Sequence, residues 1–224
     1  MSYTFEWGVF ATYLPVLFKA ALVTAETVAA SMILATIVGV VLGVLQTSRS
    51  ALARTIPTAY VEVWRGVPFL VQVLWTYFGL PLFLGITLPS LVAGILSLTL
   101  WAGAYLTEIF RGGIASIPTT QKYAGYALGM TPRRVFTRII LPQAFRRILP
   151  PYVSQLVVTV KMSSILSVIN VDEITKRADN IVVVTFRPFE VYMAAALVYF
   201  VILFALAQLG RYAEKKLRAN VLAS

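Results

Sequence analysis

The chain has 224 residues, of which 59% are hydrophobic and only 12% are charged, and its mean hydropathy is +0.82. Soluble domains of this length are much less apolar, so the composition predicts a protein embedded in a lipid bilayer. The chain has no cysteine and no histidine. Disulfides are therefore excluded and the commonest general base is missing, which disfavours a membrane enzyme.

Several apolar stretches are long enough to cross a bilayer, whose hydrocarbon core of about 30 Å requires about 20 residues of helix. The longest uncharged run follows Arg65, and Pro81, Gly85 and Pro89 divide it into two. A single charge, Lys161, interrupts a later stretch. We therefore predict a single all-α transmembrane domain with five spans. The domain covers residues 1–224, and its spans are residues 14–46, 57–80, 88–110, 148–170 and 191–210.

The basic residues lie mainly on one side of these predicted spans. A formal charge of +10 could indicate a nucleic-acid partner, but the positions of the cations matter more than their number. Cytoplasmic loops of membrane proteins are enriched in Lys and Arg, so we predict an outer N-terminus, an inner C-terminus and no nucleic acid. The inner cations would be Arg49, Arg54, Arg111, Lys122, Arg133, Arg134, Arg138, Arg146, Arg147, Arg211, Lys215, Lys216 and Arg218, and the outer ones Lys176, Arg177 and Arg187, with Lys19 near the outer end of the first span.

The connection between the third and fourth spans, residues 111–147, is a long basic segment. Its residues 121–128 can form a short helix that ends at Gly129, because glycine suits a left-handed C-terminal cap. Thr131 and Pro132 then favour the start of a second helix, which we expect to extend to about residue 140 and to support the first. A basic amphipathic helix often lies on the anionic inner leaflet. The small residues of the first helix instead suit close approach to another protein surface.

This connection contains Gly125-Tyr-Ala-Leu-Gly-Met130, followed by Arg138-Ile-Ile-Leu-Pro-Gln-Ala-Phe145. The pattern resembles the EAA loop in the membrane-spanning subunits of bacterial ABC importers. Further motifs resemble the polar amino-acid permease family, of the histidine, glutamine and arginine type, and occur in the same order. They are Tyr60-Val-Glu-Val-Trp-Arg-Gly-Val-Pro68, Gly103-Ala-Tyr-Leu-Thr-Glu-Ile-Phe-Arg-Gly-Gly113, Ser116-Ile-Pro118, Leu149-Pro-Pro151, and Lys161 with Ser163 and Ser164.

The resemblance implies a type I ABC importer transmembrane domain, in which this loop is a coupling helix that docks on a separate ATPase subunit. The family usually has Glu where this chain has Tyr123, so we expect an altered motor partner. The residues that would contact the ATPase are Tyr123, Ala124, Gly125, Leu128, Gly129 and Met130.

The resemblance also implies partners and a location. The partners are two copies of the ATPase, a second permease subunit that is either another copy or a paralogue, and an extracytoplasmic solute-binding protein. The assembly would lie in the lipid of the bacterial inner (cytoplasmic) membrane. This chain would bind no cofactor, because ATP and Mg would be used by the ATPase subunit, and no phosphate-binding loop of its own is present.

Lys161 is a charge inside a predicted span, where a cation is costly and usually faces a cavity or a partner. Its ammonium could hold a cargo carboxylate or pair with an acid such as Glu62 or Glu108. The serines after it could bind cargo or bond their own backbone. The family commonly has Asp or Asn where Met162 stands. The lack of an acid at this position argues against a cationic cargo, unless the second membrane subunit supplies the acid. The predicted substrate pathway is Lys161, Met162, Ser163 and Ser164.

Three weaker patterns have two interpretations each. Arg65 and Pro68 could belong to an anion site, but we favour a helix kink at Pro68 with Arg65 at the inner headgroups. Gly39 and Gly43 form a small-xxx-small pattern that suits close helix contact and could form a dimer face. The outer loop could receive a solute-binding protein or be merely solvated. Its charged residues are Asp172, Glu173, Lys176, Arg177, Asp179, Arg187 and Glu190.

The sequence therefore predicts a permease subunit of an ATP-driven importer for amino acids or similar polar solutes. It is not expected to be an enzyme. The alternative is a secondary transporter driven by an ion gradient, which commonly shows inverted repeats and paired ionisable residues inside the membrane. Neither feature is evident in this chain.

Overall fold

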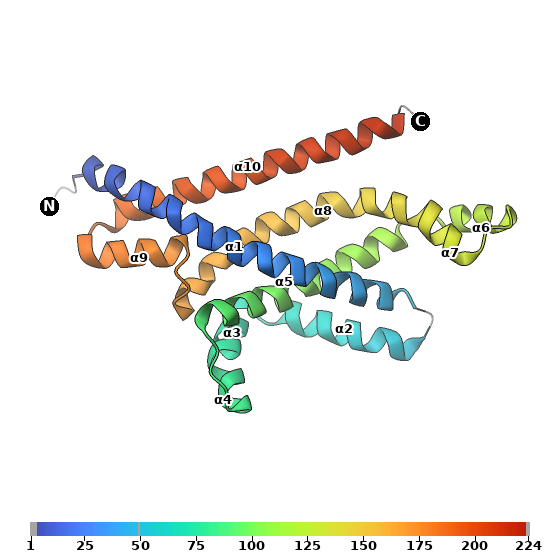
Figure 1. Cartoon of the computed structure of the whole chain (residues 1–224), viewed down its shortest axis with the longest axis horizontal. Helices are drawn as coiled ribbons and strands as arrows, with labels where there is room; N and C mark the ends of the chain where they lie inside the picture. The colour runs from blue at the N-terminus through green and yellow to red at the C-terminus, as the bar shows by residue number, and fades with distance from the viewer. Residues whose placement is uncertain (1–3, 49, 223–224) are drawn as a thin grey trace.

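The structure is a computed structural model that describes residues 4–48 and 50–222, with side chains up to residue 216. All secondary structure in the described residues is helical, which confirms the expected all-α fold. Four long helices run side by side as a bundle, and shorter elements lie at its two ends and on one side (Figure 1). The long helices are α1 (Trp7–Gln46), α5 (Ser90–Ala115), α8 (Leu141–Met162) and α10 (Pro188–Leu222).

Within residues 4–48 and 50–222, four helical stretches are long and apolar enough to cross a membrane. Each overlaps one of the predicted spans, but the ends differ. The predicted spans follow the limits of apolar sequence, whereas backbone hydrogen bonding carries a helix on through polar residues beyond the hydrocarbon core. The four stretches are Trp7–Gln46, Ser90–Ala115, Pro132–Ile169 and Pro188–Lys216.

The other predicted span, residues 57–80, is not one straight helix. Helix α2 (Ala51–Gly66) and the segment Phe69–Leu84 meet at an angle of 105°. Pro68 has no backbone N–H to continue α2, and Val67 adopts the extended backbone typical of a residue before proline. The expected kink at Pro68 is confirmed, and it divides this span in two.

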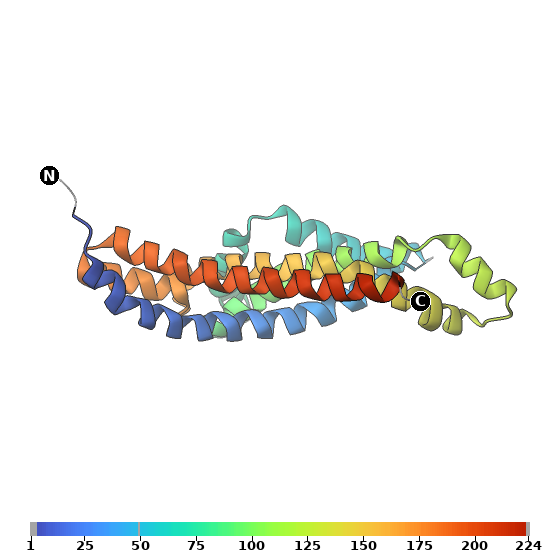
Figure 2. The ribbon, with the colours of Figure 1, turned by 90° about the horizontal axis from the view of Figure 1, so that it is seen from above.

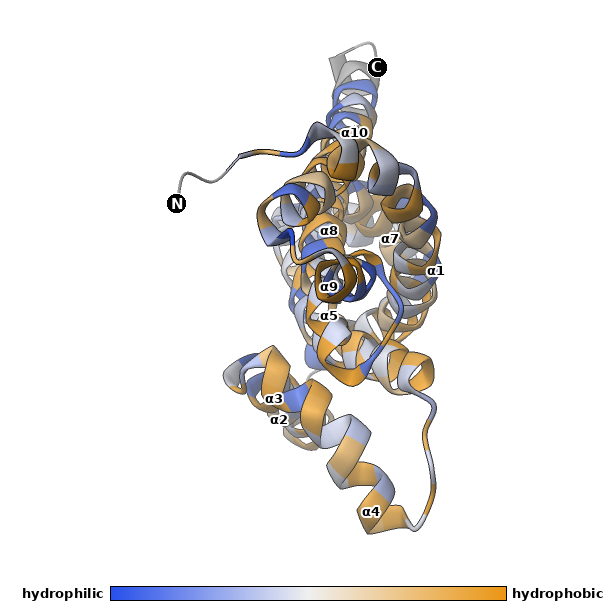
Figure 3. Cartoon of the chain, turned by 90° about the vertical axis from the view of Figure 1, so that its left-hand side faces the viewer, coloured by the Kyte–Doolittle hydropathy of each residue, from blue (hydrophilic) through white to orange (hydrophobic). Residues whose placement is uncertain are grey.

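The segment after the bend forms an arm that stands away from the bundle (Figure 3). It consists of α3 (Phe69–Leu74), the π-helical turn η1 (Trp75–Gly79) and α4 (Leu80–Leu84). The side-chain amide of Gln72 stabilises the bend, because it donates to the carbonyls of Trp64 and Val67, each 2.8 Å away. These carbonyls lie at the end of α2, where a helix leaves acceptors without intrahelical donors.

Gly39 and Gly43 bring α1 against α5. A Cβ atom at Gly39 would lie 2.6 Å from Cβ of Leu106, and one at Gly43 would lie 2.8 Å from the carbonyl oxygen of Thr107. Both positions are buried within the single chain. The prediction that this pattern could form a dimer face is therefore wrong, because the contact is used inside the subunit.

The prolines of the fourth span lie within a continuous helical stretch, Pro132–Ile169. Just before Pro142 the helix widens into the π-helical turn η2 (Phe136–Ile140). The π-helical turn η1 lies in the same way just before Pro81. A π-turn changes the hydrogen-bond register, which accommodates a residue that cannot donate. The sequence thus continues as a helix where prolines could have ended it.

The two ends of the bundle differ (Figures 1 and 2). One end holds the start of α1, the 3₁₀ turn η3 (Ser163–Ile169) and α9 (Ile174–Thr185). At the other end a helical hairpin of α6 (Thr119–Ala127) and α7 (Pro132–Val135) projects beyond the long helices. The late part of α10 runs toward the hairpin end, so the two ends of the described chain lie at opposite ends of the bundle.

Candidate functional site

The projecting hairpin is shaped by local signals that the sequence carries. Helix α6 ends in a Schellman motif: Met130 N–H donates to the Gly125 carbonyl at 3.1 Å and Gly129 N–H donates to the Tyr126 carbonyl at 2.9 Å. Gly129 has φ +72°, as this motif requires. The Thr131 hydroxyl then accepts from the N–H of Arg134, with Pro132 in the first turn of α7. The expected helix–glycine–helix arrangement is confirmed.

The tip of the hairpin presents apolar side chains to its surroundings. Tyr123 is 68% exposed and Leu128 is 80% exposed, and Ala124 and Gly129 are exposed as well. Tyr126 is 45% exposed, yet it is absent from the predicted contact residues, although its place three residues after Tyr123 on a helix puts both on one side. Apolar side chains exposed at a projecting tip are typical of a protein contact.

Two predicted contact residues face the other way. Gly125 is buried, and a Cβ there would lie 2.8 Å from both Val135 Cγ2 and Ile139 Cδ1. In the single chain this glycine lets α6 cross α7 and η2 closely, and its contact with a partner stays a prediction. Met130 is half-buried against the cluster of Ile117, Val135, Ile140, Ala144 and Ile148, which packs the hairpin onto the start of α8.

Lys161 lies near the end of α8 with an exposed side chain. Among the described residues it forms no ion pair and donates no side-chain hydrogen bond, whereas Glu108 pairs with Arg111 at 2.6 Å. The pairing of Lys161 with Glu62 or Glu108 that the sequence left open is therefore absent from the single chain. Lys161 ends a stripe of exposed residues spaced three or four apart on one face of α8. The stripe is Arg147, Pro151, Ser154, Val158 and Lys161.

The other residues of the predicted pathway follow Lys161 at the start of η3. Met162 is half-buried and packs against the main core. The hydroxyl of buried Ser163 donates to the Val160 carbonyl at 2.8 Å, and that of Ser164 donates to the Lys161 carbonyl at 2.7 Å. The hydroxyls of both serines thus bond carbonyls of their own helical stretch, as in the interpretation that gives them no cargo. Lys161 is the one member of this set with an unoccupied polar group among the described side chains.

A cleft of about 400 Å³, lined by charged and apolar residues, opens where α2, α5 and α8 meet, and Arg147 of the α8 stripe lies in its wall. The guanidinium of Arg65 lies 4.9 Å from the centroid of the Tyr105 ring on the opposite wall, a cation–π contact. Arg147 donates to the carbonyl of Ser116, at the end of α5. The sequence placed Arg65 at the headgroups and did not bring it together with Arg147.

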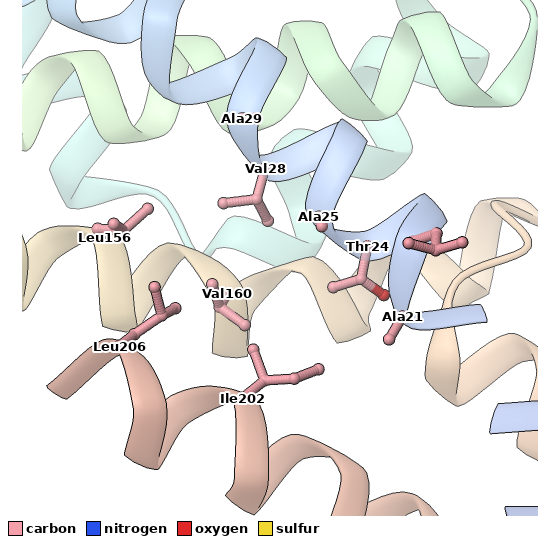
Figure 4. A pocket seen from close by; sticks show the side chains of 10 residues that line it. Ala21, Thr24, Ala25, Val28, Ala29, Leu156, Val160, Ile202 and Leu206 are labelled. Carbon is pink, nitrogen blue, oxygen red and sulfur yellow. The ribbon is translucent and has the colours of Figure 1, made fainter. Parts of the chain in front are cut away.

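A second cavity, of about 330 Å³, lies between α1, α8 and α10 (Figure 4). Its lining is apolar apart from the hydroxyl of Thr24, which donates to a carbonyl of its own helix. This cavity offers no charge to a polar cargo. Its lining residues are Ala21, Leu22, Thr24, Ala25, Val28, Ala29, Leu156, Val160, Ile202 and Leu206.

Several charged side chains near α9 form hydrogen bonds and ion pairs within the chain, unlike those of a merely solvated loop. Glu173 is completely buried and caps α9 by accepting from the Lys176 N–H at 2.8 Å. It is therefore not available to a docking protein, contrary to its place among the outer charges. Asp172 pairs with Arg177. The described residues hold no group of three or more acidic, His or Cys side chains that could bind a metal ion.

Four candidate spans, a bent helix pair and a projecting, apolar-tipped hairpin together give this subunit the architecture of a transporter permease. The chain belongs to the family of inner membrane components of binding-protein-dependent transport systems, whose profile matches residues 35–219. This bears out the family to which the motifs pointed, and it supports an ABC importer permease over an ion-gradient transporter.

Relatives of known role match nearly the whole chain. The arginine transport system permease protein ArtQ of Bacillus subtilis (strain 168) is 33% identical over 92% of this chain and 94% of its own length. The glutamine transport system permease protein GlnP of Escherichia coli (strain K12) is 31% identical over 96% of this chain and 98% of its own. The expected permease identity is thus confirmed at the level of the family.

Solved structures share the fold. The crystal structure of an amino acid ABC transporter with histidines contains a chain that is 31% identical, with a TM-score of 0.90, and the match covers 96% of this chain and 100% of that one. The inward-facing MetNI methionine ABC transporter matches with a TM-score of 0.75 over 90% of this chain and 95% of that one, at 18% identity, and shows the fold alone. The type I importer architecture is therefore confirmed.

Proposed function

We propose that the chain moves amino acids or amino-acid-like polar solutes across the inner membrane, driven by ATP hydrolysis in separate subunits. The observation that carries this proposal is the match of relatives for arginine and glutamine transport over nearly their whole length. The fold neighbour at 31% identity, an amino acid ABC transporter, points to the same class of cargo.

The hairpin would be the joint to the ATPase subunits. Tyr123, Tyr126 and Leu128 are exposed at a tip that projects beyond the bundle, where they could fill an apolar groove on another protein. The buried cluster around Val135 holds the hairpin firmly on α8, so movement of the tip would be passed to a span. The assembly would hold two permease subunits and two ATPase copies, and each ATPase copy would bind the hairpin of one permease subunit. ATP and Mg would be used by the ATPase copies.

The distribution of cations supports an orientation with the hairpin inside the cell. Arg133, Arg134 and Arg138 lie on the hairpin, and Arg211 lies late in α10. At the opposite end, the guanidinium of Arg177 is paired with Asp172, so its charge is locally balanced. By the positive-inside rule the hairpin and the C-terminus would face the cytoplasm and the N-terminus the outside. Arg49 and the side chain of Arg218, also predicted inside, lie outside the described residues.

The exposed Lys161 supports a cargo pathway that is completed by a second permease subunit, either another copy or a paralogue. An unpaired cation within a span is costly in lipid, so its face of α8 would be covered by protein or lined by water. The ammonium would there hold a cargo carboxylate. A solute-binding protein would deliver the cargo at the α9 end of the bundle.

Native mass spectrometry through a tag on this chain tests the assembly. We expect two ATPase copies and two membrane subunits, with one mass for the latter if the chain pairs with itself. The same complex, placed in liposomes with a binding protein, should accumulate radiolabelled glutamine or arginine only with ATP. Uptake by this chain alone under an ion gradient, together with its recovery free of any ATPase, would refute the proposal.

Lys161→Met tests the pathway within this assembly. We expect assembly and ATP hydrolysis to persist while uptake falls by about tenfold or more, which corresponds to about 1.4 kcal/mol or more of lost interaction. Uptake at the wild-type rate would remove Lys161 from the pathway without affecting the assignment of the subunit.

A further inference from the structure

The cleft between α2, α5 and α8 lies at the hairpin end of the bundle and has a volume of about 400 Å³. Arg65 comes from α2, Tyr105 and Glu108 from α5, and Arg147 from α8. It is therefore built from three helices that are far apart in the sequence. The sequence offered an anion site at Arg65 and Pro68 as the less favoured interpretation, but it gave no sign that Arg147 lies in the same cleft.

The charge of the cleft is positive. The carboxylate of Glu108 is held by Arg111, with Oε2 at 2.6 Å from Nη2 and Oε1 at 3.2 Å from Nε, and it also attracts the charge of Arg65. The acid in the wall is therefore balanced, and Arg147 adds a further cation. Arg65 contacts the ring of Tyr105 but donates no hydrogen bond within the described part of the chain. Arg147 uses one N–H for the Ser116 carbonyl. Each guanidinium has five N–H donors, so most donors of Arg65 and Arg147 remain for a ligand.

The cleft contains one end of the exposed stripe of α8, Arg147 and Pro151, and Lys161 lies at the other end of the stripe. Lys161 and Arg147 are fourteen residues apart on this helix, which corresponds to about 21 Å at a rise of 1.5 Å per residue. Between them the stripe holds Pro151, Ser154 and Val158, none of them acidic. One helix face thus carries a cation at each end and no acid to repel an anion in between.

We propose that the Arg65–Arg147 cleft is a second anion site, which receives the cargo carboxylate at the hairpin end of the pathway after it leaves Lys161. A guanidinium binds a carboxylate through two parallel N–H donors, whereas a lysine offers a point charge. The inference rests on the proposed function and adds the inner half of the route. It also requires that the cargo keep a free carboxylate.

The site has a mechanical consequence because Arg147 also holds the Ser116 carbonyl. Ser116 directly follows α5 and begins the connection to α6. A carboxylate in the cleft would compete for the guanidinium of Arg147 and alter that tether. Cargo at this site would thereby act on the base of the coupling hairpin.

The test uses the complete transporter, with its ATPase and binding protein, in liposomes. Arg65→Gln and Arg147→Gln each keep hydrogen-bonding capacity but remove the cation. Arg146→Gln is the matched control, because Arg146 is an exposed neighbour on α8 that does not line the cleft. We expect the maximal rate of radiolabelled glutamine uptake to fall about tenfold in both cleft variants, equivalent to about 1.4 kcal/mol. The external glutamine concentration that gives half-maximal uptake should stay unchanged, because it is set by the solute-binding protein on the outer side of the membrane.

Equilibrium binding of the same glutamine probe to the nucleotide-free complex gives a second measurement that a purely structural role would not change. Its affinity should fall in both cleft variants and not in Arg146→Gln, with native mass spectra confirming equal assembly. An added excess of glutaminol, which lacks the carboxylate, should compete poorly with glutamine in the wild type.

The outcomes separate this inference from the proposed function. Normal uptake and binding in both cleft variants, with uptake lost in Lys161→Met, would overturn the second site and leave the importer standing. Failure of the wild-type complex to take up either glutamine or arginine with ATP would overturn the proposed function and the second site with it. An anionic phospholipid retained by the wild type but lost in Arg65→Gln, with uptake unaffected, would assign the cleft to a lipid headgroup instead.

Discussion

The hydroxyl of Tyr199 on α10 donates a 2.6 Å hydrogen bond to the buried carboxylate of Glu173, the residue that caps α9. The Tyr199 hydroxyl also lies 3.1 Å from that of Thr175. This cluster joins α9 to α10 at the end of the bundle away from the hairpin. Burial raises the pKa of Glu173 above its ordinary value of 4.5, although the hydrogen bond from Tyr199 acts in the opposite direction.

The raised pKa makes stability depend on pH. A folded state that holds its proton more tightly than the unfolded chain is favoured below the unfolded pKa of 4.5, and this contribution is lost as pH rises through the folded pKa. The midpoint of thermal unfolding, followed by size-exclusion fluorescence, should therefore fall over that interval. Glu173→Gln, which mimics the protonated side chain, should remove this part of the slope and be more stable at neutral pH. Asp172→Asn is the control, and an unchanged slope in Glu173→Gln would contradict the prediction.

Gln72→Leu should destabilise the bend between α2 and α3. The substitution keeps an apolar body in a buried position but leaves the carbonyls of Trp64 and Val67 without their donor. An acceptor left unsatisfied costs about 1–3 kcal/mol, and we expect a loss in that range from thermal unfolding of the purified protein. Gln121→Leu, at an exposed position on α6, should change stability little. Equal effects of the two substitutions would mean that the bend does not depend on Gln72.

Gly129→Ala should strain the tip of the hairpin through its backbone alone. An added Cβ would meet no atom within 4 Å, but the φ of +72° costs a residue with a side chain about 1–2 kcal/mol. Gly129→Asn should cost less, because Asn tolerates the left-handed region. We expect faster protease cleavage of the hairpin and slower ATP-driven uptake in the order Ala, Asn, wild type. Membrane insertion should be unchanged, and indistinguishable Ala and Asn variants would show that φ does not limit this turn.

Tyr123→Ala and Leu128→Ala should weaken attachment of the ATPase without destabilising the permease. Both side chains are largely exposed in the single chain, so their truncation removes little internal packing. Anchors at the centre of a protein interface contribute about 1–3 kcal/mol or more each. The amount of ATPase that co-purifies with the tagged permease is measured at increasing salt and detergent concentrations. Thr120→Ala, exposed on the same helix, serves for comparison. Full ATPase recovery in the Tyr123 and Leu128 variants would place the contact elsewhere.

The hairpin was the most predictable part of the site because its signals are local. Gly129, Thr131 and Pro132 each act on the backbone within a few residues, so the end of one helix and the start of the next could be inferred from the sequence. The direction in which each side chain points could not. Gly125 belongs to the same short motif, yet it faces Val135 across the hairpin, which the motif does not indicate.

The sequence by itself determined that the protein lies in a lipid bilayer, that its fold is all-α and to which family it belongs. These properties depend on composition, on runs of apolar residues and on the order of motifs along the chain. Tertiary structure alone decided that Glu173 is buried under Tyr199, that Gly39 contacts Leu106, and that Arg65 and Arg147 share a cleft. Each of these relationships joins helices that are distant in the sequence. Burial and the distance between two charges arise only when such helices pack, because periodicity within one helix defines its faces but not which neighbour covers them.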